Sequence, residues 1–304
     1  MQRASDIRAG FLLALVSASA FGALPILGKF AFEEGFQVAT LLAWRFGLAV
    51  ALIWAVVAAA PAVGPRGAAA IGGRRRLALI CLGVLYAVNS ALYFLALERI
   101  PATTTSLLFY VYPALVALLG IALLRHSPRP MKLVALGTSL LGVLLTVGLS
   151  RAGLDPAGIA LARGSAAVVA LYFILAELAL TGLPTLPATA LVLTGTVLAY
   201  AGWLAASGAP ALPPSAAGWR LVAAMAAFCT VLSLLAMLGA LRRVGAGTTS
   251  IVSTLEPAVT VLLAAAILGE RLALRQLAGG ALILAGVAVL RLATRRPAPA
   301  LVDA

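Results

Sequence analysis

The sequence predicts an all-α polytopic membrane protein whose ten transmembrane helices form two inverted five-helix repeats. Three observations predict this class: the composition, the spacing of the apolar segments and an internal repeat. Hydrophobic residues make up 63% of the 304 residues and charged residues 10%, whereas soluble domains have about 45–50% and about 25%. A soluble globule cannot bury that much apolar surface, but ten membrane helices of about 20 residues each would use about 200 residues.

Each of the apolar segments is long enough to cross a bilayer as a helix, and none alternates as the strands of a membrane barrel do. They span residues 9–29, 38–60, 77–97, 102–124, 131–150, 157–180, 187–206, 216–241, 247–268 and 273–293. The first contains Ala18-Ser19-Ala20, which resembles a signal-peptide cleavage site. Because the apolar run continues to Leu27, we expect this segment to be retained as the first helix.

The net charge of +13 comes from 22 Lys and Arg residues, which fall mostly in the short gaps between apolar segments. Counted by alternate gaps, 14 of them lie on the side of the termini and 7 on the other side, with Arg45 inside a span. Positive loops stay in the cytoplasm. We therefore expect both termini to be cytoplasmic in a multi-pass protein of the bacterial inner (plasma) membrane, and we expect no nucleic-acid partner.

An internal repeat appears when Pro113 is placed over Pro257, because residues 96–145 then align with 240–289 without a gap and 17 of the 50 pairs are identical. Identical pairs include Arg99/Arg243. The repeats are predicted as residues 1–150 and 151–304. A repeat of five spans enters the membrane upside down in its second copy, and inverted repeats are typical of secondary transporters. The first two helices of one repeat could not be aligned with the first two of the other from the sequence alone.

Several short motifs occur in an order that resembles the EamA-type transporters of the drug/metabolite transporter (DMT) superfamily. They are Phe21-Gly22 with Lys29, Trp44-Arg45-Phe46, Ala96 to Ala102, Gly245-Ala246-Gly247 through Glu256-Pro257, and Leu268 to Arg271. The resemblance implies a ten-helix bundle that exports small metabolites or amino acids. Within the family, the pocket chemistry favours the YddG-like aromatic amino acid exporters.

One departure from the superfamily concerns energy coupling. Its four-helix multidrug members carry a glutamate in the middle of helix 1, whereas no acidic residue lies between Gly10 and Lys29 here. The proton antiport of those members therefore cannot be assigned to this chain. Both proton-coupled transport and uniport remain possible for it.

The candidate substrate-binding residues form stripes at helical spacing on equivalent helices of the two repeats. One copy is aromatic and the other carries hydroxyl and carboxyl groups, a composition that suits an amphipathic small molecule. The predicted site residues are Tyr86, Asn89, Tyr93, Phe109, Tyr112, Ser233, Met237, Ser253 and Glu256.

Two ionisable residues inside the spans have alternative interpretations. Glu256 lies near mid-bilayer, where an ionisable group is costly and indicates function; it would exchange a proton or pair with a substrate ammonium, or else bond nearby hydroxyls structurally. Arg45 would neutralise a carboxylate or form a structural ion pair with Glu33 or Glu34, and we favour the ion pair.

Enzyme chemistry is not expected. The one histidine, His126, lies in a polar gap, and the sequence has no phosphate-binding G-x-x-x-x-G-K-[ST] loop, so no metal, cofactor or ATP site is predicted. The expected partners are a small-molecule substrate and the lipid bilayer, with monomer and homodimer both open. The alternatives are a flippase for a lipid-linked headgroup, which the scarcity of Lys and Arg in the stripes disfavours, and an exporter of drugs or other metabolites.

Overall fold

A computed structural model describes residues 2–60, 65–100, 102–125, 130–147, 155–208, 212, 215–268 and 273–295. Every regular element within these ranges is a helix, which confirms the all-α prediction. In the described part of the chain, eight helical segments are long and apolar enough to cross a membrane, and Pro130–Thr146 and Glu256–Ile267 are shorter apolar helices. Residues 126 and 148–154, which include His126 and the predicted boundary between the repeats, lie outside the described residues.

The helices of the first half follow the predicted spans closely. They are α1 (Gln2–Gly22), α2 (Leu24–Glu33), α3 (Val38–Ala59), α4 (Pro65–Ala70), α5 (Gly73–Leu97), α6 (Ala102–Phe109), α7 (Tyr112–Leu124) and α8 (Pro130–Val147). The first span is α1 and α2 in succession, and the fourth is α6 and α7. The short helix α4 lies in the second gap, where the sequence predicted no element.

The second half has the same plan. Its elements are α9 (Pro156–Ala179), α10 (Thr185–Ser207), α11 (Ala216–Ala226), the π-helical turn η1 (Ala227–Leu232), α12 (Ser233–Ser253), α13 (Glu256–Leu268) and α14 (Leu274–Arg295). Gly245 interrupts α12 with φ 80° and ψ 167°, a conformation that favours glycine. The eighth span therefore ends at Gly245, and the rest of α12 begins the ninth.

The fourth and ninth spans are broken at equivalent places. The offset of 144 residues that aligns the sequences carries α6 onto the last turns of α12, and α7 onto α13, with the same ends. Each break precedes a proline, Pro113 or Pro257, which has no backbone N–H and clashes with the preceding turn. The internal repeat is thus reproduced in the backbone.

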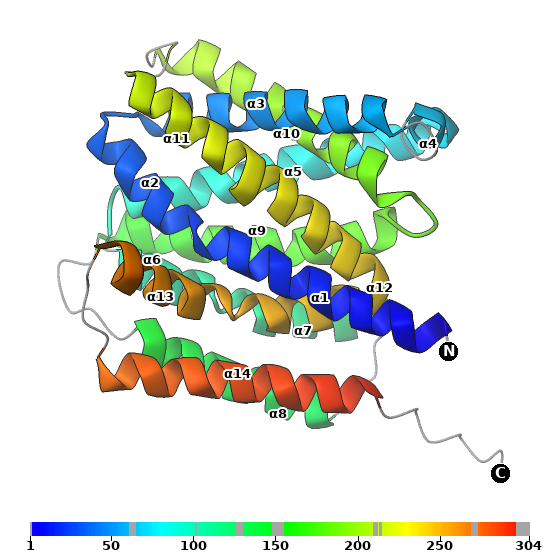
Figure 1. Ribbon diagram of the computed structural model, residues 1–304, viewed down its shortest axis with the longest axis vertical. Helices are drawn as coiled ribbons and strands as arrows, with labels where there is room; N and C mark the ends of the chain where they lie inside the picture. Colours follow the sequence, from blue (N-terminus) through cyan, green and yellow to red (C-terminus); the bar gives the residue numbers. More distant parts are fainter. Residues whose placement is uncertain are drawn as a thin grey trace.

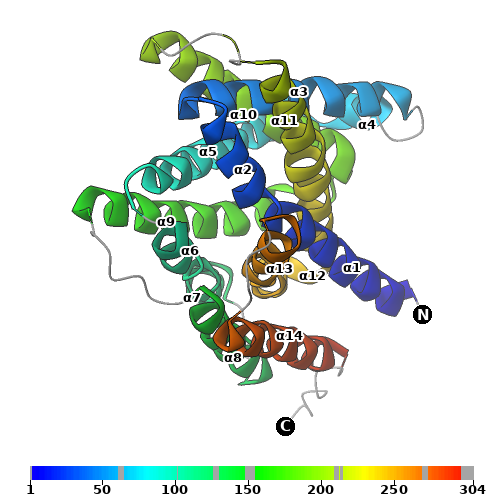
Figure 2. The same ribbon diagram turned by 60° about the vertical axis from the view of Figure 1, so that its left-hand side comes forward.

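The helix packing has the same pseudo-symmetry. α1 packs along α12 as α9 packs along α5, while α8 packs on α14 and α3 on α10 across the relating axis. Figures 1 and 2 show α8 with α14 at one edge of the bundle and α3 with α10 at the opposite edge. The start of α1 and the end of α14 lie at the same end of the bundle (Figure 1), which we call the proximal end; the other end is the distal end.

Close contact between α8 and α14 depends on glycine. A Cβ atom added to Gly142 would lie 2.7 Å from the carbonyl oxygen of Gly279 and 2.7 Å from the backbone nitrogen of Ile283. Small residues of this kind let membrane helices approach at backbone distance. The two last helices of the repeats are therefore held together as one unit.

Gly142→Leu should destabilise the protein by about 1–3 kcal/mol, the usual cost of overpacking. Gly137→Leu is the matched control, because it lies on the same helix and, apart from that helix's own backbone, no described atom lies within 4 Å of an added Cβ. Thermal unfolding of the two purified variants in detergent measures the difference. Equal unfolding temperatures would contradict the close helix contact.

Candidate functional site

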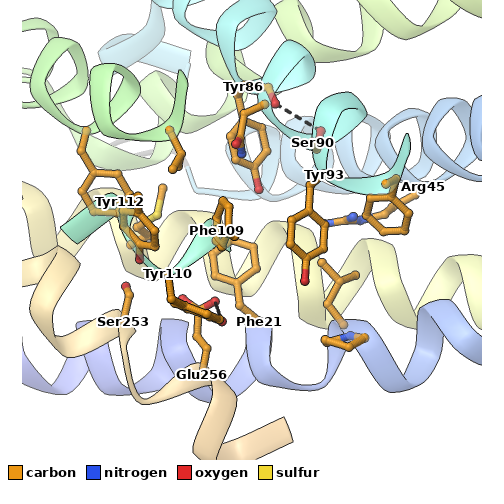
Figure 3. Close-up of a pocket in the computed structure, with 17 residues that line it drawn as sticks. Phe21, Arg45, Tyr86, Ser90, Tyr93, Phe109, Tyr110, Tyr112, Ser253 and Glu256 are labelled. Atoms are coloured by element: carbon orange, nitrogen blue, oxygen red, sulfur yellow. Dashed lines mark hydrogen bonds between the residues drawn. The ribbon is translucent and has the colours of Figure 1, made fainter. Parts of the chain in front are cut away.

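A cavity of about 90 Å³ lies at the centre of the bundle, between the broken spans and the helices that flank them. We call it the central cavity. Figure 3 shows its side chains converging from both halves of the chain. Its lining comprises Phe21, Leu24, Pro25, Arg45, Tyr86, Asn89, Ser90, Tyr93, Phe94, Phe109, Tyr110, Tyr112, Val169, Phe173, Met237, Ser253 and Glu256. Discontinuous helices with freed backbone groups form the substrate sites of many transporters.

The structure brings eight of the nine predicted site residues to this cavity, and Ser233 is the exception. Ser233 is fully buried, and its hydroxyl donates a hydrogen bond to the Thr230 carbonyl oxygen at 3.4 Å. The prediction that Ser233 faces the site is therefore corrected. A π-helical turn, Ala227–Leu232, lies immediately before Ser233, whereas Met237, predicted from the same offset, does line the cavity.

Glu256 begins α13 at the break of the ninth span. The Tyr110 hydroxyl, from the equivalent break of the fourth span, donates a hydrogen bond to Glu256 Oε2 at 3.1 Å. Among the described residues, no Lys or Arg forms an ion pair with this carboxyl. The two breaks thus meet across the cavity through a phenol and a carboxyl group, and the carboxyl is placed to accept a proton or a cationic group.

Arg45 does not pair with Glu33 or Glu34, and the ion pair favoured by the sequence is corrected. Its Nε donates to Thr230 Oγ1 at 2.7 Å and its Nη2 to the Cys229 carbonyl oxygen at 3.1 Å. Both acceptors belong to η1, whose wide turn frees backbone carbonyls from the regular helical pattern. Glu34 instead accepts a hydrogen bond from the Ser215 hydroxyl.

Aromatic rings form a continuous wall along one side of the cavity. The ring centroids of Tyr93 and Phe109 are 5.0 Å apart, those of Phe109 and Tyr112 are 5.0 Å apart, and those of Tyr112 and Phe173 are 5.6 Å apart. Offset and edge-to-face contacts at these distances stabilise aromatic clusters. The wall offers an apolar, polarisable surface to a flat group.

Some lining residues were missed by the sequence analysis, for identifiable reasons. Tyr110 lies in the break itself, where the stripe through Phe109 and Tyr112 no longer follows helical spacing. Phe21 and Phe173 lie on the first helices of the two repeats, which had not been aligned. Tyr110 could have been found from the aligned prolines, because they mark the position of the break in which it lies.

A larger cavity of about 610 Å³, the distal vestibule, adjoins the central cavity and reaches toward the distal end. The two cavities share five lining residues: Leu24, Pro25, Tyr93, Phe94 and Tyr110. Lys29 and Glu33 at the end of α2 and Gln276 at the start of α14 also line the vestibule. The central cavity therefore leads toward the distal end in this conformation.

A third cavity of about 460 Å³, the proximal vestibule, lies toward the opposite end. It shares no lining residue with the central cavity. Four of its residues are the counterparts, at the offset of 144, of residues in the distal vestibule: Val116/Thr260, Ala117/Val261, Gly120/Ala264 and Lys132/Gln276. The two vestibules are thus pseudo-symmetric spaces at opposite ends of the same bundle.

The model of the EamA-like transporter family matches the chain twice, over residues 8–148 and 156–292. A solved structure, titled only as a crystal structure of a protein, aligns with a TM-score of 0.80 at 20% identity over 95% of this chain and 98% of the other. That likeness shows the fold. No curated protein matches the chain. The family match confirms the resemblance drawn from the motifs, and no named relative indicates a substrate.

Glu256→Gln should reduce solute flux about tenfold or more, the scale of losing a hydrogen bond to a charged group, while expression and the unfolding temperature stay near wild type. The amide oxygen of glutamine can still accept the Tyr110 hydrogen bond, so the substitution removes mainly the charge. Flux in proteoliposomes and thermal unfolding of the same preparation measure the two effects. Normal flux would leave Glu256 a structural role only.

Proposed function

We propose that this chain, which belongs to the EamA-like transporter family, is a secondary transporter that exports small amphipathic metabolites by alternating access. Aromatic amino acids are the first choice of substrate and other neutral amino acids the second. The observation that supports this most is the central cavity between two vestibules whose linings include four pairs of equivalent positions. The site residues are the eight predicted residues of the cavity together with Tyr110 and Arg45.

The pseudo-symmetry of the repeats supports alternating access. If the two repeats exchange conformations, the contacts that now separate the central cavity from the proximal vestibule form at the distal side instead. The breaks before Pro113 and Pro257 supply places where the fourth and ninth spans can bend, because their backbone hydrogen bonding is already interrupted. The site can then open to one end at a time.

The proximal end already has a contact suited to such a gate. The Glu177 carboxylate on α9 accepts a hydrogen bond from the backbone N–H of Ala246 at 2.8 Å, directly after the kink at Gly245. A carboxylate at a helix N-terminus is favourable because it meets free N–H groups and the positive end of the dipole. In the alternating-access scheme this contact breaks when the proximal vestibule opens.

The size of the cavities favours a solute that extends toward the distal vestibule. The central cavity of about 90 Å³ is smaller than the roughly 150 Å³ apolar cavity that holds a benzene molecule in an engineered protein. An aromatic side chain would therefore stack near Tyr93 and Phe109 and extend into the shared space beyond Tyr93. Polar groups at Asn89, Ser253 and Glu256 suit the polar end of an amphipathic molecule.

The charge distribution supports an orientation in which the proximal end faces the cytoplasm. Proximal gaps and helix ends carry Arg66, Arg74, Arg75, Arg76, Arg242 and Arg243. By the positive-inside rule the proximal end faces the cytoplasm, so the described conformation would be open to the outside of a bacterial inner membrane. Both termini would then be cytoplasmic.

Labelled phenylalanine should show saturable counterflow in proteoliposomes, and Tyr93→Ala or Tyr112→Ala should reduce it about tenfold, since each truncation removes an aromatic contact and leaves a cavity. Phe228→Ala is the matched control, because Phe228 is 61% exposed and lies outside the central cavity. Repeating the assay with a pH gradient separates proton coupling from uniport. Flux of threonine or a cationic dye alone would overturn the aromatic substrate, and flux of no solute would favour the lipid-headgroup flippase.

Alternating access also predicts opposite changes in accessibility at equivalent positions of the two vestibules. Ala117→Cys and Val261→Cys, each in a chain with Cys81 and Cys229 replaced by alanine, place a thiol in the proximal and distal vestibules respectively. Adding transported substrate should raise the maleimide labelling of one thiol and lower that of the other. Parallel changes, or none, would contradict the exchange of conformations.

A further inference from the structure

Among the described residues, one nitrogen of the Arg45 guanidinium has no hydrogen-bond partner. Arg45 is only 1% exposed and lines the central cavity. Its Nε and Nη2 are used by Thr230 and the Cys229 carbonyl, whereas Nη1 is buried with no hydrogen-bond partner. The Phe46 ring lies 4.8 Å below the guanidinium carbon, and this contact leaves the N–H groups unused.

An incompletely paired, buried guanidinium is costly. Arginine stays protonated in proteins, and a buried charge without a counter-ion loses its hydration without replacement. Among the described residues, no carboxylate pairs with Arg45. The sequence therefore keeps a cation in the core, fixes two of its nitrogens and leaves the third for another group.

Asn89 adds a second donor to the same cavity. The Ser165 hydroxyl donates to Asn89 Oδ1 at 2.9 Å and to the Asn89 carbonyl oxygen at 3.1 Å. Because the amide oxygen is used in this way, the NH₂ group is the part of Asn89 that can donate to a solute. The donors Arg45 and Asn89 and the carboxyl of Glu256 thus line one cavity.

We propose that Arg45 Nη1, assisted by Asn89, forms a carboxylate subsite, so that the solute must carry an anionic group as well as an apolar one. This inference rests on the proposed transport function and narrows its substrate class. A carboxylate accepts charge-assisted hydrogen bonds from a guanidinium, which are stronger than neutral ones. It would also supply the counter-ion that the core lacks. Solutes that carry only an ammonium group would leave Nη1 unpaired.

Three probes with the same ring test the subsite: phenylalanine, phenethylamine without the carboxylate, and 3-phenylpropionate without the ammonium. Each is measured in two ways, as a competitor of counterflow in proteoliposomes and as a stabiliser in thermal unfolding of the purified protein. The variants are Arg45→Gln and Arg45→Lys. Arg66→Gln is the matched control, because Arg66 is exposed on α4 and outside the cavity.

In wild type we expect phenylalanine and 3-phenylpropionate to compete and to stabilise, and phenethylamine to be weaker about tenfold or more, as for a hydrogen bond to a charged group. In Arg45→Gln, phenylalanine and 3-phenylpropionate should compete and stabilise no better than phenethylamine, whose own effect should be unchanged. Arg45→Lys should recover part of it, since it restores the charge without the planar fork. The control should behave as wild type.

Other outcomes separate the two proposals. If phenylalanine is transported but wild type accepts phenethylamine equally, or Arg45→Gln weakens all three probes alike, the subsite is overturned and the transport function stands. If phenylalanine is not transported but 3-phenylpropionate stabilises wild type and not Arg45→Gln, the subsite stands and the aromatic amino acid substrate falls. If no probe is transported and none stabilises the protein, both proposals are overturned. The wild-type comparison holds even if Arg45→Gln fails to fold.

Discussion

The central constraint on this structure is the interruption of two spans at equivalent points, immediately before Pro113 and Pro257. A continuous helix in lipid satisfies its own backbone and leaves no polar opening at mid-membrane. A break there is tolerated only inside the bundle, so the surrounding helices must enclose it. The central cavity is the space they enclose, and Tyr110 and Glu256, one from each break, are joined across it by a hydrogen bond. The site thus follows from the two breaks.

How much of this was predictable depends on which residues carried a signal. The ten spans followed from apolar length, and the fourth and ninth could be compared because proline, threonine and serine coincide at the offset of 144.

The first and sixth spans carry a weaker signal that only packing makes visible. Gly10 approaches Arg243 and Val244 closely, while Gly158 approaches Arg99 and Ile100. These neighbours are equivalent in the repeat, so Gly10 corresponds to Gly158. Ser17/Ser165 and Ile26/Ile174 then also coincide, but in an Ala- and Leu-rich chain such matches are too few to choose the register without the contacts.

Arg45 and Ser233 could not be assigned correctly from the sequence for a different reason. Both residues contact the π-helical turn at Ala227–Leu232. Arg45 donates to Thr230 Oγ1 and to the Cys229 carbonyl oxygen, and Ser233 donates back to the Thr230 carbonyl oxygen. Nothing in the residues of that segment indicates the turn, because its equivalent in the first repeat lies within the regular helix α5. The corrections at Ser233 and Arg45 therefore both involve contacts with this turn.

The repeats share a backbone plan but differ in chemistry where the pathway lies. Tyr112 in one copy corresponds to Glu256 in the other, and the alignment through Gly10 and Gly158 makes Lys29 the counterpart of Glu177. These last two residues line opposite vestibules. A carboxylate can accept the free N–H of a helix start, as Glu177 does from Ala246, but an ammonium group cannot, because it has only donors. In the proposed alternating-access scheme a symmetric scaffold lets both conformations form, and this asymmetry of charge means that the two ends would not be closed by the same contact. In that scheme the balance between the two conformations would be set by a few side chains rather than by the fold.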